Sequence, residues 1–77
     1  MGEQRIELDV RQLPPALRHK KIFELWEQLA SGQSIRLIND HDPKPLQYQF
    51  QAEFNGKFDW HGEQEGPDDW VVTIRKK

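Results

Sequence analysis

The sequence predicts an α+β fold, a two-layer α/β sandwich in which a four-stranded mixed sheet carries two helices on one face. Four stretches alternate apolar and polar side chains, and two others repeat apolar side chains at helical spacing. Their order along the chain is βαβαββ, which makes the first two strands parallel through a right-handed crossover. The strands are apolar mainly on one face, as expected where helices cover only that side.

The chain opens with a strand followed by a helix. Residues 5–11 read RIELDVR, in which Ile6, Leu8 and Val10 alternate with charged residues and should point toward the core. Pro14–Pro15 breaks the strand and suits the first turn of a helix. Apolar side chains then recur at helical spacing until Ser31–Gly32 ends the helix, namely Ile22, Phe23, Trp26, Leu29 and Ala30.

A second strand and a second helix follow. Residues 34–39 alternate again, with Ile35 and Leu37 on the face that should be buried. Asp42 before Pro43 predicts an N-cap followed by proline at the first helical position. The helix is marked by Leu46, Phe50 and Phe54, and Asn55–Gly56 ends it.

The last third of the chain predicts two further strands. Phe58 and Trp60 open the third strand, and His61 should end it at the surface. Residues 62–69, GEQEGPDD, are predicted as a turn, after which residues 70–74 form the fourth strand. We expect all three tryptophans, Trp26, Trp60 and Trp70, in the core.

The composition limits the classes of protein that need to be considered. Seventy-seven residues predict one domain, 1–77, with a core over about residues 5–75. The chain has no cysteine, which excludes disulfides, thiolate zinc sites and thiol nucleophiles and fits a cytoplasmic protein. No apolar stretch is long enough to span a membrane. The net charge of −2 argues against general binding of nucleic acid.

A family resemblance is carried by three motifs, LDVRQLPPALRHKKIF, LINDHDPKPLQYQ and EGPDDWVVTIRK. Together they resemble the bacterial domain-of-unknown-function family 2249 over nearly the whole chain. That family is similar in fold to the TusA/SirA-like sulfur carriers, whose cysteine lies in a C-P-x-P motif at the start of the first helix. This chain has Pro14–Ala16 there, so sulfur transfer does not carry over. The resemblance also implies a hemerythrin-like or cupin-like partner protein and a redox or metal-related process.

The edge at which both helices begin is the predicted site. Both helices should start at the carboxyl ends of parallel strands, where open α/β sheets bind ligands. His19 would then lie near His41, and Asn39, Asp40 and Asp42 would complete a binding site. The same two histidines, with carboxylate oxygen, are an alternative iron, zinc or haem site.

These residues also have a structural interpretation, which the sequence leaves open. Asp42 is a suitable N-cap, and Asp40 can stabilise the turn by accepting backbone hydrogen bonds. His19 would hydrogen-bond back to residues 40–42 and so clamp the first helix to the second.

A basic cluster adjoins the same edge and consists of Arg11, Arg18, Lys20 and Lys21. Its position near two helix N-termini suits an anion, and RNA is a further alternative. Against RNA, the open face of the sheet should present Glu7, Asp9 and Arg36 rather than stacked aromatic side chains.

No motif predicts an independent enzyme, because the serines lack a G-x-S-x-G context and no phosphate loop or dinucleotide fingerprint occurs. We therefore expect a small accessory module without a resident cofactor. It would act on a partner protein through His19 and residues 40–42. Iron, zinc or haem binding is the alternative function, and anion or RNA binding is a further one.

Overall fold

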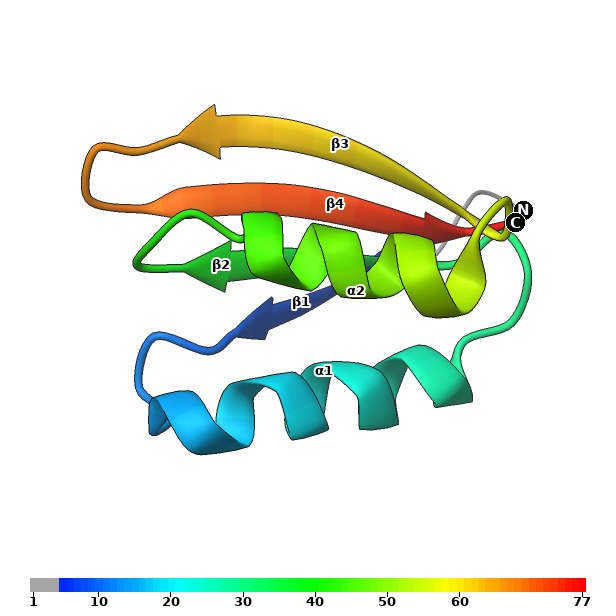
Figure 1. Ribbon diagram of the computed structural model, residues 1–77, viewed down its shortest axis with the longest axis horizontal. Helices are drawn as coiled ribbons and strands as arrows, with labels where there is room; N and C mark the ends of the chain where they lie inside the picture. Colours follow the sequence, from blue (N-terminus) through cyan, green and yellow to red (C-terminus); the bar gives the residue numbers. More distant parts are fainter. Residues whose placement is uncertain (1–4) are drawn as a thin grey trace.

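The computed structural model describes residues 5–77 and shows six elements in the order βαβαββ (Figure 1). They are β1 (Arg5–Asp9), α1 (Pro15–Gln28), β2 (Ser34–Asn39), α2 (Lys44–Phe54), β3 (Phe58–Glu65) and β4 (Trp70–Lys76). Both helices cover the same face of one four-stranded sheet. The predicted α+β sandwich is therefore confirmed.

The strand order in the sheet is β1-β2-β4-β3. β1 and β2 are parallel, as the intervening helix requires, whereas β4 is antiparallel to both β2 and β3. In the register, Asn39 at the end of β2 pairs with Trp70 at the start of β4. The turn between β3 and β4 therefore lies at the same edge of the sheet as the starts of both helices.

The core fills the space between the sheet and the two helices. It is formed by Val10, Ile22, Trp26, Leu29, Ile35, Leu37, Leu46, Phe50, Val72 and Ile74. Phe50 is completely buried, and its ring lies 5.0–5.4 Å from the rings of Phe23, Trp26, Phe54 and Phe58. The predicted alternation holds for β2 but weakens in β1, where Ile6 is 39% exposed because β1 is an edge strand.

The ends of three predicted strands differ from the structure. β1 ends at Asp9 rather than at residue 11, and β4 continues to Lys76 rather than ending at residue 74. β3 continues to Glu65, so most of the GEQEGPDD segment is strand, and His61 lies within β3 opposite Thr73 rather than at its end. The tight turn is confined to residues 66–69. The second half of β3 could not be recognised in the sequence because it lies in an edge strand and is exposed on both faces. It therefore lacks the alternation of apolar side chains that marks a strand.

The helix boundaries lie close to the prediction. α1 begins at Pro15 and ends at Gln28, and Gly32 occupies the following turn at a φ of 90°. α2 begins at Lys44, one residue later than predicted, and Asp42 precedes its N-cap, Pro43. Neither helix is long and apolar enough to cross a membrane, in the part of the chain that the structure describes.

The open face of the sheet carries ion pairs. Arg36 Nη1 donates to Glu7 Oε1 at 2.7 Å, and Arg36 Nε donates to Glu63 Oε1 at 3.3 Å. The Thr73 hydroxyl donates to the other carboxylate oxygen of Glu63. The predicted charged face is confirmed, and its cations are already paired with carboxylates.

Candidate functional site

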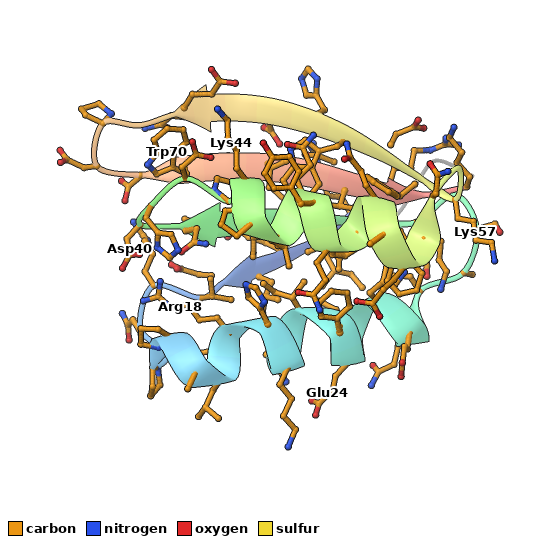
Figure 2. The ribbon with its side chains drawn as sticks, in the orientation of Figure 1. Arg18, Glu24, Asp40, Lys44, Lys57 and Trp70 are labelled. Atoms are coloured by element: carbon orange, nitrogen blue, oxygen red, sulfur yellow. The ribbon has the colours of Figure 1, made fainter. Side chains whose placement is uncertain are left out.

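The site is built where β1 and β2 end, α1 begins and β4 starts. Figure 2 shows the Arg18 side chain reaching from α1 toward Asp40, immediately after β2. Arg18 is on the same stripe of α1 as Ile22 and Trp26, the other buried residues of that helix. Only 8% of its side chain is exposed, so its charge must be compensated by neighbouring groups.

Every nitrogen of the Arg18 guanidinium has an acceptor. Nη1 donates to Asp40 Oδ1 at 2.7 Å and Nη2 donates to Asp40 Oδ2 at 3.1 Å, a two-pronged ion pair. Nη1 also donates to Asn39 Oδ1 at 3.0 Å. Nε donates to the Leu13 carbonyl at 3.0 Å, and Nη2 donates to the Arg11 carbonyl at 3.3 Å. Arg18 therefore ties α1, the loop after β1 and the loop after β2 together.

The ion pair fixes the charge state of Asp40. The hydrogen bonds from Arg18 hold the pKa of the Asp40 carboxyl well below its usual range, and the contact with His41 lowers it further. Asp40 in turn raises the pKa of Arg18. Buried Asn39 completes the arrangement, since its Oδ1 also accepts the backbone N–H of Asp40 at 2.9 Å.

The Asp40 carboxylate orients the imidazole of His41. Nδ1 of His41 lies 2.9 Å from Asp40 Oδ1 and 3.4 Å from Arg18 Nη1. A carboxylate only accepts and a guanidinium only donates, so the shorter contact assigns the proton of the neutral ring to Nδ1. Nε2 is then a hydrogen-bond acceptor on a side chain that is 59% exposed. In its neutral form, the imidazole that Asp40 holds at Nδ1 presents the lone pair of Nε2 to solvent.

His19 does not form the predicted clamp. It is exposed on α1, and its ring makes an edge contact with Phe23, with centroids 6.5 Å apart. No hydrogen bond joins it to residues 40–42 within the range 5–77 that the structure describes. A clamp between α1 and the loop after β2 is present, but it is formed by Arg18, one position before His19 on the helix. Asp42 is not the predicted N-cap, because Pro43 occupies that position without a side-chain capping bond. Asp42 Oδ1 instead accepts the Lys44 N–H at 3.0 Å, as in an Asx-type turn.

The four predicted anion-binding cations do not form one free patch. Arg18 is buried, and Arg11 donates to Asp9 at 2.9 and 2.7 Å and to Asp69 at 3.0 Å. Those bonds raise the pKa of Arg11, Asp9 having the larger effect. Lys20 and Lys21 are exposed on α1. As for metals, no group of three or more His, Cys, Asp or Glu side chains among the described residues is arranged to hold an ion.

The structure also has a groove at the same edge of the sheet, which the sequence did not predict. It has a volume of about 310 Å³ and lies between the start of α2 and the β3–β4 hairpin. Trp60 and Trp70 line it and are only half-buried, so of the three tryptophans expected in the core only Trp26 is fully enclosed. Trp70 packs against the turn, where a Cβ on Gly66 would lie 2.9 Å from its ring.

Comparison with known proteins gives one match. The family model described as "Uncharacterized conserved protein (DUF2249)" matches residues 7–76. No curated protein and no solved structure matches the chain.

Proposed function

The chain belongs to the DUF2249 family of uncharacterized conserved proteins, and we propose that it is a cytoplasmic accessory module that binds a partner protein. The binding surface is the loop edge, defined as residues 40–43 together with residues 66–69. The observation that carries the proposal is the Arg18–Asp40–His41 arrangement. Buried Arg18 holds Asp40, and Asp40 orients an exposed imidazole.

This arrangement reduces the entropic cost of binding. An exposed side chain normally loses conformational freedom when a partner immobilises it, at about 0.5–1.5 kcal/mol per side chain. His41 is already oriented by its bond to Asp40, and the loop that bears it is tied to α1. The edge therefore has the preorganisation expected of a recognition surface.

The charge of the edge indicates the chemistry of the partner. The acidic side chains at this edge are Asp9, Asp40, Asp42, Asp68 and Asp69. Arg11 and Arg18 pair with Asp9, Asp40 and Asp69, whereas Asp42 and Asp68 form no ion pair within residues 5–77. Lys20, Lys21 and Lys44 are exposed cations nearby. A complementary partner would bring positive charge and hydrogen-bond donors, one of which would reach Nε2 of His41. Hemerythrin-like and cupin-like proteins are the first candidates.

His41→Gln should reduce capture of this partner about tenfold, as for an interface residue worth about 1.4 kcal/mol. The measurement is quantitative pull-down from native lysate with tagged wild-type protein and the variant. His61→Gln is the matched control, because His61 is an exposed histidine on β3, away from the loop edge. Equal capture by all three proteins would exclude His41 from the interaction.

Direct metal or haem ligation by His41 is a second candidate. It is supported by the bond from Nδ1 to Asp40, since histidine ligands commonly donate their other ring nitrogen to a carboxylate. Nε2 of His41 would be the ligating atom. The His19 side chain would have to turn toward His41 to contribute a second ligand. Titration with iron, zinc and haem, followed by absorbance and metal analysis, tests this. Sub-micromolar binding that is lost in His41→Ala supports ligation, and its absence in wild-type protein rejects it.

A further inference from the structure

The groove between α2 and the β3–β4 hairpin has the composition of a binding site. Its walls and floor include Lys44, Gln47, Trp60, Gly62, Glu65 and Trp70. Its volume of about 310 Å³ is at the lower end for ligand pockets, enough for one long side chain or a small molecule. In Figure 2 the labelled Lys44 and Trp70 side chains lie together at this end of the molecule.

The groove exists because Gly62 lacks a side chain. Gly62 pairs with Val72, and Trp60 pairs with Ile74, so both Gly62 and Trp60 face the helices. The backbone at Gly62 is outside the left-handed region, and therefore its conformation does not require glycine. The three atoms nearest to a Cβ there all belong to the Glu65 side chain, and the closest is Oε1 at 3.2 Å. The missing side chain opens a gap between the two tryptophans.

The carboxylate of Glu65 occupies that gap. The positions of its Cγ, Cδ and Oε1 within 3.9 Å of the Cβ site show that the side chain folds back over Gly62. It forms no ion pair or hydrogen bond with any residue in the range 5–77. An unpaired carboxylate between two half-exposed indoles attracts cations, by charge and through the faces of the rings.

We propose that the groove receives the guanidinium of an arginine side chain from the partner protein. Arginine suits it better than lysine, because a planar guanidinium stacks on tryptophan and bonds a carboxylate with two nitrogens. The amide oxygen of Gln47 adds an acceptor on the α2 wall. The inference rests on the proposed function, since it names the group by which a basic partner engages the acidic edge.

Lys44 allows an experiment to distinguish a cationic ligand from an anionic one. It lines the opposite wall, is exposed and forms no ion pair with a described carboxylate. Against a cationic ligand it is repulsive, so Lys44→Gln should strengthen binding about twofold, whereas Glu65→Gln should weaken it about fivefold to tenfold. An anionic ligand would give both effects with the opposite sign.

The experiment is a titration of the whole protein with Nα-acetyl-arginine amide, followed through the indole N–H resonances in ¹H–¹⁵N spectra. Trp60 and Trp70 should shift with a Kd on the order of 1 mM, and Trp26, which is 2% exposed, is the internal control. The neutral isostere Nα-acetyl-citrulline amide should bind at least about tenfold more weakly. Gly62→Val, which fills the gap without backbone strain, should abolish the shifts while the melting temperature is retained.

Three results would overturn the inference. They are no shift of either groove tryptophan at about 20 mM ligand, equal binding of citrulline, and weaker binding in Lys44→Gln. His41→Gln separates this inference from the proposed function. If that variant loses the partner while wild-type protein does not bind arginine amide, only the groove inference fails. If arginine amide binds but His41→Gln retains the partner, only the role of the loop edge fails.

Discussion

Replacing Arg18 with methionine should lower the melting temperature by about 10 °C or more, although methionine matches the length of the arginine stem. The change removes the Arg18 donors to the half-exposed Asp40 carboxylate and to the Leu13 carbonyl, and it leaves the buried Asn39 amide oxygen with one of its two hydrogen bonds, the one from the Asp40 N–H. A buried acceptor without a donor is destabilising because it has also lost its hydrogen bonds to water. Thermal melts followed by circular dichroism measure the effect.

Two further variants test the cause of this loss. Lys20→Met removes an exposed cation from the same helix and should leave the melting temperature within about 3 °C of wild type. Arg18→Lys keeps the charge but cannot form the two-pronged bond to Asp40, so it should recover only a small part of the loss. If Arg18→Met also melts within about 3 °C of wild type, the clamp does not stabilise the fold.

The dependence on pH gives an independent readout of the same ion pair. The pKa of Asp40 is lower in the folded protein than its ordinary value of 3.8. Its contribution to stability is therefore fully present above about pH 4 and is lost as the pH falls from there through the folded-state pKa. Solvent reduces this contribution because 43% of the side chain is exposed. Arg18→Met should lack this part of the acid-induced loss.

Phe50→Ala should destabilise the domain by about 3–5 kcal/mol, the cost of emptying a fully buried aromatic site. Small domains of this size have stabilities near the lower end of the usual range of about 5–15 kcal/mol. The variant should therefore be largely unfolded at physiological temperature. Urea denaturation measures the loss.

Tyr48→Ala is the matched control for Phe50→Ala. Tyr48 is on the same helix and is 63% exposed, so the substitution should change the stability by less than about 1 kcal/mol. A loss below about 1 kcal/mol for Phe50→Ala would mean that the aromatic cluster does not organise the core.

The fold and the position of the site could be predicted because they depend on periodicity and chirality. Apolar alternation located β2, and the parallel crossover placed both helix starts at one edge. The clamp residue could not be assigned with the same certainty, since adjacent helical residues differ by about 100° in direction. Arg18 is four positions before Ile22 and shares its buried stripe, which favours it over His19. However, a long cationic side chain at such a position is usually predicted to be exposed to solvent.

The groove could not be predicted because it depends on the register of two strands. The groove is formed by two large residues and one without a side chain, namely Trp60, Trp70 and Gly62. The sequence around each of them does not show which of them lie close together in the sheet. Only the pairing of Gly62 with Val72 places the missing side chain between the two indoles. The irregular register between Gly62 and Gln64 then turns Glu65 back over the gap.

The strand order has a consequence for self-association. β1 and β3 are the two margins of the sheet, and each leaves a row of backbone amides and carbonyls that another chain can extend into an aggregate. β1 is only five residues long and carries Arg5, Glu7 and Asp9. On β3 the bulge near Gly62 interrupts the regular spacing of those amides. A strand from another chain would therefore meet charged side chains at β1 and an interrupted row of backbone amides at β3. This should keep concentrated solutions of the folded protein free of fibrils.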